Sequence, residues 1–289
     1  MFVMLPPILL DATLEVDKRA LRRHAARVVA FAVVGTSLST VATALAVAGA
    51  TGWSAAEALT FGSLIAPTDP CAILAILKDR LHVSPKSALY IGVFGESILN
   101  DAVSFQLYAA FAKRLVEAPG ADVWGRAGAW AGVVGDFCRS SVLAVAIGAG
   151  AAAVAYALLR LGRRRGAAPA ADAALFLFLC LVPYYVGLAL DISSVLGLVV
   201  AALLLDAFGL PLLCGEGERA ARELSRTVAL LNETLVFCYL GVVVVETSGA
   251  VKWDAKLAAL AVAAALLGRL ASTVPLVAAF AAADRWAAR

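Results

Sequence analysis

Long apolar runs alternate with short polar stretches along almost the whole chain. A helix that crosses a bilayer needs about 20 apolar residues, which sets the length that a run must reach. Eight runs reach it, whereas the first is too short and is interpreted as the end of a helix whose beginning is absent. The nine segments are 1–12, 28–50, 54–77, 86–112, 131–159, 172–190, 192–210, 227–246 and 256–283. They predict an all-α polytopic membrane protein with about eight full transmembrane helices and one partial helix.

The lysines and arginines are shared unevenly between the loops. Over alternate loops, starting at 13–27, one side of the membrane carries 17 of them and the other side carries 5. Cytoplasmic loops are enriched in Lys and Arg, so the richer side is predicted to be cytoplasmic. Arg269 is an exception to this distribution, because it lies deep within an apolar segment.

Composition narrows the class of protein further. Hydrophobic residues make up 62% and charged residues 16% of the chain, against about 45–50% and 25% in soluble domains. The net charge of +3 is too small to indicate nucleic-acid binding. The sequence has no glycine-rich phosphate loop and no paired CxxC motif, so we expect the chain to bind no cofactor. We also do not expect it to be an enzyme. The cysteines are interpreted as small buried hydrophobic residues: Cys71, Cys138, Cys180, Cys214 and Cys238.

Two prolines interrupt the apolar run SLIAPTDPCAILAIL. Pro67 and Pro70 bracket Thr68 and Asp69, and each proline removes a backbone donor and clashes with the preceding turn. The helix is therefore predicted to unwind in the middle of the membrane. Unwound backbone is tolerated there when it lines a cavity or is buried in protein, and many transporters build ion sites from such broken helices. The alternative is a simple proline kink that Thr68 and Asp69 cap.

The stretch FGESILNDAVSF places two acids inside another apolar run. An ionised carboxylate at this depth costs about 2.5–3.5 kcal/mol, so intramembrane acids indicate function by default. On a helix, Ser97, Asp101 and Ser104 share one stripe, and Glu96 and Asn100 share the neighbouring stripe. Asp101 with its hydroxyl neighbours is predicted to be an oxygen-rich cation ligand.

Glu96 requires a buried partner. Arg269, in the stretch LLGRLAST, is the only basic residue deep in another apolar segment, so we predict that the two pair. The alternative is that Glu96 and Asp101 both serve helix packing through hydrogen bonds. This alternative is better suited to Glu96 than to Asp101.

Three further acids lie near the ends of apolar segments. Glu233, in TVALLNETLVFCYLGV, either binds an ion or caps a helix, and we favour a functional role. The sequon that begins at Asn232 lies beside a predicted cytoplasmic loop, which argues against glycosylation. Asp11 and Asp206 lie at predicted cytoplasmic ends, where an acid costs little, and are interpreted as interfacial residues.

Six segments of the chain resemble consecutive landmarks of the eukaryotic sodium/proton exchangers. They occur in the family's order and cover nearly the whole chain, and the block around GESILNDAVS is highly specific. The segments are MLPPILLDA, FAVVGTSLST, FGSLIAPTDPCAILAIL, FGESILNDAVS, LNETLVFCYLGV and LLGRLAS. The pairing of LNETLVFCYLGV with LLGRLASTVPL resembles the Golgi and endosomal branch more than the plasma-membrane branch.

The resemblance implies an antiporter that exchanges Na⁺ or K⁺ for H⁺ and works as a homodimer in an inverted-repeat fold. Asp101 matches the family's cation- and proton-binding acid, and Asn100 matches the neighbour that marks electroneutral members. Asp69 matches the acid of the unwound helix, and Thr68 stands where hydroxyl or small apolar residues occur. With Ser97 from the hydroxyl stripe, these residues form the predicted ion site, and no resident metal is expected.

The resemblance also assigns roles outside the ion site. Glu96 and Arg269 match a structural ion pair of the core, and Glu233 matches a glutamate that influences transport. A core domain is expected to slide against a dimerisation scaffold. The implied division is 1–27 for the end of a scaffold helix and a cytoplasmic loop, 28–113 for the core, 131–159 for a linker helix, 172–246 for the scaffold and 256–289 for the start of the second core half.

Family members carry further helices before MLPPILLDA and after the segment with Arg269, including a second broken helix. From this departure we expect the chain to be truncated at both ends. Two functions stay open: an electroneutral cation/proton antiporter, and a non-transporting membrane subunit that dimerises with intact exchangers and modulates them. The predicted location is a Golgi or endosomal membrane, with the plasma membrane as the alternative.

Overall fold

The computed structural model of the chain describes residues 3–68, 76–84, 87–117, 127–164, 168–248 and 254–287. Helices account for almost all of these residues, and the described part contains no strand. The elements are α1 (Leu5–Glu15), α2 (Lys18–Ala30), η1 (Phe31–Gly35), α3 (Thr36–Thr51), α4 (Ala55–Ile65), η2 (Ile76–Arg80), α6 (Ala88–Glu117), α7 (Ala127–Arg164), α8 (Pro169–Ala189), α9 (Ser194–Phe208), η3 (Leu210–Leu212), α10 (Gly215–Ser248) and α11 (Ala255–Ala287). Every predicted apolar segment falls on one or more of these helices.

Many of these helices are suited to a bilayer. Six helical stretches within the described residues are long and apolar enough to cross one: Lys18–Thr51, Trp130–Arg163, Pro169–Ala189, Ser194–Leu212, Gly215–Ser248 and Ala255–Arg285. Helix α4 is a shorter apolar helix, and α6 spans 30 residues but carries Glu96 and Asp101. The prediction of an all-α polytopic membrane protein is confirmed.

Two stretches that the hydrophobic pattern marks as loops are largely helical. Residues 18–27 belong to α2, which continues through the π-helical turn η1 into α3, and residues 215–226 form the first three turns of α10. Both stretches are rich in Ala and Arg, and residues 215–226 also carry Glu; these residue types favour helix regardless of polarity. The hydrophobic pattern therefore marked the apolar part of each helix and missed its polar extension.

The helices group into two compact units. The first unit contains residues 1–18 and 140–253, and the second contains residues 19–139 and 254–289. Each unit therefore joins segments that are far apart in the sequence. The assignment of such groups as scaffold and core remains a prediction.

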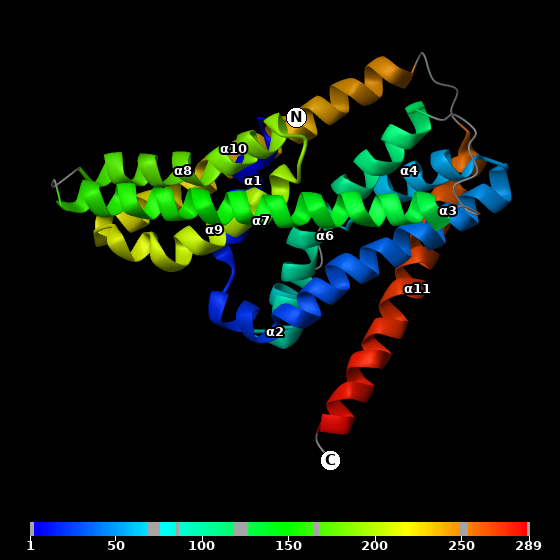
Figure 1. Cartoon of the computed structure of the whole chain (residues 1–289), viewed down its shortest axis with the longest axis horizontal. Helices are drawn as coiled ribbons and strands as arrows, with labels where there is room; N and C mark the ends of the chain where they lie inside the picture. Colours follow the sequence, from blue (N-terminus) through cyan, green and yellow to red (C-terminus); the bar gives the residue numbers. More distant parts are fainter. Residues whose placement is uncertain are drawn as a thin grey trace. The chain divides into compact units, whose positions relative to one another are not determined.

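In the first unit, α8 packs against α9 and α10, and α1 packs against α9 and α10 (Figure 1). Leu10, Phe176, Cys180 and Leu205 are among the buried residues of its core. Small residues allow close packing of the helices here. A Cβ at Gly148 of α7 would lie 2.5 Å from the carbonyl oxygen of Gly197 in α9, so only glycine fits.

In the second unit, α3 packs against both α11 and α4, and α4 packs against α6 (Figure 1). Leu59, Val103 and Phe111 are in its apolar core. Gly62 of α4 lies so close to α3 that a Cβ would stand 2.6 Å from the carbonyl oxygen of Thr40. This close packing places α6 and α11, which carry the charged residues of the candidate site, in the same unit.

Candidate functional site

Helix α6 carries the polar stripe that the sequence predicts. The helix is continuous from Ala88 to Glu117, so Ser97, Asp101 and Ser104 lie one and two turns apart on one face. Ser97 and Ser104 are buried, and Asp101 is partly buried. The Ser104 hydroxyl donates a hydrogen bond to the backbone oxygen of Ser63, so it joins α6 to α4.

Glu96 and Arg269 form the ion pair that the sequence predicts. Arg269 of α11 donates from Nη1 to Oε1 of Glu96 at 2.7 Å. The two side chains are mostly buried, with exposed fractions of 17% for Glu96 and 20% for Arg269. Because each charge is held away from solvent, each depends on the other for compensation.

Arg269 also contacts the segment that follows α4. Its Nη2 donates to the Thr68 hydroxyl at 2.8 Å, while Nη1 binds Glu96. Helix α4 ends at Ile65, and Pro67 and Thr68 are not helical, so the helix stops before the first proline. Asp69, Pro70 and Cys71 lie outside the described residues.

Asn100 is the most unusual polar residue of the site. Its side chain is fully buried on α6, and within the described residues neither its amide oxygen nor its amide nitrogen forms a hydrogen bond. A buried polar group without a partner costs about 1–3 kcal/mol, and such groups are retained where function requires them. The hydroxyls of Thr36, Ser39 and Thr40 on α3 are likewise buried without a partner in the described part.

These side chains offer oxygen ligands and no soft ligand. Carboxylate, amide and hydroxyl oxygens come from Asp101, Asn100 and Ser97, which suit a hard cation. Among the described residues, no group of three or more His, Cys, Asp or Glu could hold a metal ion.

Asp206 is buried within the protein, whereas the sequence is interpreted as placing it at the membrane interface. Its side chain has no exposed surface, and it forms ion pairs with Lys18 Nζ at 2.6 Å and Arg222 Nη2 at 3.2 Å. Lys18 Nζ also donates to the Asp206 backbone oxygen, and Arg222 Nη1 donates to the backbone oxygen of Leu14. The acid is buried because two basic side chains from neighbouring helices reach it, which position in the sequence alone does not reveal.

The other two acids singled out in the sequence, Glu233 and Asp11, also belong to the first unit. Glu233 lies within α10, well after its start, and its side chain is exposed, so it does not cap the helix. Asp11 lies on α1 and is partly buried. The influence of Glu233 on transport stays a prediction.

The interpretation of the cysteines as buried residues is largely wrong. Of those that the structure describes, Cys180 is buried, whereas Cys138, Cys214 and Cys238 are exposed free thiols. Cys138 and Cys238 lie on helices long enough to cross a bilayer. An apolar residue on such a helix can face lipid, so apolar surroundings in the sequence do not require burial within the protein.

Comparison with known proteins gives the family. The family described as sodium/hydrogen exchanger, transmembrane, matches residues 1–288. The chain is 30% identical to sodium/hydrogen exchanger 3 of Triakis scyllium over 249 residues, which cover 83% of this chain and 29% of that protein. It is 29% identical to sodium/hydrogen exchanger 1 of Dictyostelium discoideum over 280 residues, covering 94% of this chain and 39% of that protein. Sodium/hydrogen exchanger 8 of Rattus norvegicus is 28% identical over 250 residues, with 83% and 42% covered.

The apolar helices and their buried polar residues define a multi-pass integral membrane protein. With a family match over nearly its whole length, the chain belongs to the sodium/hydrogen exchanger family. It spans between 29% and 42% of the length of these three relatives.

Proposed function

We propose that the chain forms part of an antiporter that exchanges a monovalent cation, Na⁺ or K⁺, for a proton. The single observation that carries this proposal is Asn100, which is fully buried with both amide atoms unpaired in the described part of α6, directly before Asp101. A bound cation would satisfy the amide oxygen, and water in a hydrated cavity would satisfy both the oxygen and the amide nitrogen. Family membership supports the same activity.

The proposed mechanism is a competition for Asp101. A carboxylate within the membrane is costly as a free charge, so it is stable when a proton or a cation neutralises it. Each ligand excludes the other because both occupy the same oxygens. If the site crosses the membrane only when it is neutralised, outward movement of one ligand requires inward movement of the other, and alternating access couples the two fluxes.

The neutral residue Asn100 beside the acid Asp101 sets the proposed stoichiometry of exchange. Asn100 carries no charge at any pH, so one carboxylate exchanges one proton for one monovalent cation. The cycle is then electroneutral. Ser97, Thr68 and Asp69 are proposed to complete the coordination, and Glu96 with Arg269 is proposed to be structural.

We further propose that the two units correspond to the two moving parts of the family's mechanism. The second unit carries α6 and α11 and is proposed to be the ion-carrying core. The first unit is proposed to be the scaffold through which two copies associate. Helix α10 supports this role, because its apolar half bears large exposed side chains, including Leu231, Leu235 and Tyr239.

The same exposed helix suits the second candidate function, a non-transporting subunit that dimerises with intact exchangers and modulates them. Purified chain in vesicles distinguishes the two functions. Vesicles loaded with Na⁺ or K⁺ are diluted into cation-free buffer, and luminal pH is followed with a dye. Exchange predicts acidification of the lumen that depends on the outward cation gradient. A pH trace identical to that of protein-free vesicles would contradict transport by this chain and favour the modulating subunit.

A further inference from the structure

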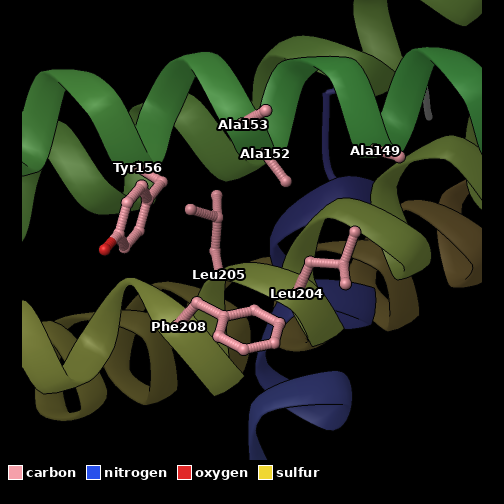
Figure 2. A pocket seen from close by; sticks show the side chains of 7 residues that line it. All are labelled: Ala149, Ala152, Ala153, Tyr156, Leu204, Leu205 and Phe208. Atoms are coloured by element: carbon pink, nitrogen blue, oxygen red, sulfur yellow. The ribbon is translucent and has the colours of Figure 1, made fainter.

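An apolar hollow opens between two helices of the first unit, whereas the candidate ion-site residues belong to the second unit. Its volume is about 340 Å³, and α7 supplies one wall while α9 supplies the other (Figure 2). The lining residues are Ala149, Ala152, Ala153, Tyr156, Leu204, Leu205 and Phe208. The hollow exists because three alanines on α7 face larger side chains on α9. Apart from the Tyr156 hydroxyl, every one of these side chains is a hydrocarbon, so the hollow suits a hydrocarbon ligand.

Two arginines continue the same face of α7 beyond the hollow. Arg160 and Arg163 follow Tyr156 by four and seven residues, so they lie on its stripe, about 6 Å and 10 Å further along the helix axis. Both are exposed, and neither has a hydrogen bond or ion pair within the described residues. In Figure 2 the Tyr156 hydroxyl lies at the end of the hollow remote from Ala149, which is the end nearer these arginines.

The membrane orientation gives these arginines a location. The loop at 160–171 belongs to the side that carries 17 of the loop lysines and arginines, which is predicted to be cytoplasmic. An apolar hollow at membrane depth thus runs toward unpaired positive charge at the cytoplasmic surface. A phospholipid of the cytoplasmic leaflet presents groups in the matching order, with its acyl chain at membrane depth and its phosphate at the surface.

We propose that this face of α7 and α9 binds one anionic phospholipid of the cytoplasmic leaflet. One acyl chain occupies the hollow, and the phosphate oxygens accept hydrogen bonds from the guanidinium groups of Arg160 and Arg163. Arginine forks match phosphate geometry and carry a permanent charge, which favours an anionic over a zwitterionic headgroup.

A second copy of the chain fits this face poorly. A two-fold symmetric contact places the same patch on both partners. The contact would then bring Arg160 and Arg163 of each copy toward the same basic residues of the other. Like charges facing each other across an interface are unfavourable, so charge complementarity selects the lipid.

Lipid binding to the purified full chain tests the proposal. Native mass spectrometry counts bound phosphatidylglycerol and phosphatidylcholine at matched concentrations. Each arginine near an anionic headgroup adds to the binding free energy. The two together should give a preference of about 30-fold for phosphatidylglycerol over phosphatidylcholine. The double variant Arg160→Gln/Arg163→Gln should lose most of this preference. The matched control Arg22→Gln/Arg23→Gln, which removes two exposed arginines from α2, should retain it.

A variant of the hollow tests the acyl-chain half of the proposal. Ala153 is exposed and lies at the rim, so Ala153→Phe fills the hollow without entering the core. Retention of both lipids should fall. Equal phosphatidylglycerol binding by the Arg160→Gln/Arg163→Gln variant and its control would overturn the proposal. So would wild-type binding by Ala153→Phe, complete displacement of the lipid by millimolar inorganic phosphate, or conversion of a dimer to monomers by Ala153→Phe with lipid binding unchanged.

Discussion

Arg269 contacts two different segments of the second unit through a single guanidinium group. Nη1 binds Glu96 in α6, and Nη2 binds Thr68 just after the end of α4. A planar guanidinium presents donors in a fixed fork, so the position of one partner constrains the other. Arg269 therefore orients the segment that leads into Asp69 relative to the helix that carries Asp101.

The first prediction concerns the Glu96–Arg269 pair. Removing one partner leaves the other mostly buried without compensation, a loss of about 3–5 kcal/mol in soluble proteins. Glu96→Gln or Arg269→Leu should therefore lower the unfolding temperature in detergent. The reversed pair, Glu96→Arg with Arg269→Glu, should recover part of the loss. A reversed pair no more stable than the worse single variant would show that the contact contributes nothing to stability.

Whether an ion pair could be predicted from the sequence depends on how many basic residues could reach the acid. The Glu96–Arg269 contact was predictable because the chain offers only one basic residue deep in another apolar segment. The Asp206 ion pairs were not predictable, because several basic residues flank the same membrane surface. Their choice depends on helix packing, and no local pattern encodes which helices meet.

At the scale of helices, Asp206 connects elements that are distant in the sequence. It lies at the end of α9 and binds Lys18, at the start of α2, and Arg222, in α10. Lys18 and Arg222 keep exposed fractions of 35% and 42%, whereas the Asp206 side chain has none. The three charged groups therefore differ in their access to solvent, because only the two basic groups can turn toward it.

The second prediction follows from this asymmetry. Replacing both Lys18 and Arg222 by Ala leaves a buried carboxylate unpaired and should lower stability strongly, by about 3–5 kcal/mol. Asp206→Asn leaves two cations that can reach water and should cost less. Arg219→Ala, an exposed residue of the same helix α10, is the control and should change little. Thermal unfolding in detergent gives the order, and a larger loss for Asp206→Asn than for the double variant would contradict it.

Helix boundaries show which parts of the fold the hydrophobic pattern encodes. The apolar portion of each helix and the turn at Asp191 follow from the sequence, because a bilayer requires long apolar runs. The polar extensions of α2 and α10 do not, since hydropathy does not distinguish a solvated helix from a loop. The end of α4 before Pro67 follows from proline geometry.

For the molecule as a whole, the proposed cycle moves no net charge. The third prediction is that a membrane potential, imposed at equal cation concentration and equal pH on both sides, drives no proton flux through the reconstituted chain. Asn100→Asp adds a second acid beside Asp101 and should make the flux respond to voltage. A steady current in the unmodified protein that reverses with voltage would rule out one-for-one exchange.

Proton flux in vesicles that contain the Asp101→Asn variant tests whether Asp101 is the shared site for cation and proton. This change removes the titrating carboxylate and keeps the shape of the side chain, so folding and assembly should be retained, as size-exclusion chromatography and thermal unfolding can check. Asp11→Asn, on α1 of the first unit, is the matched control. Cation-driven acidification should be abolished in Asp101→Asn and preserved in Asp11→Asn. Wild-type flux in the Asp101→Asn vesicles would contradict the assignment of Asp101 as the shared site for cation and proton.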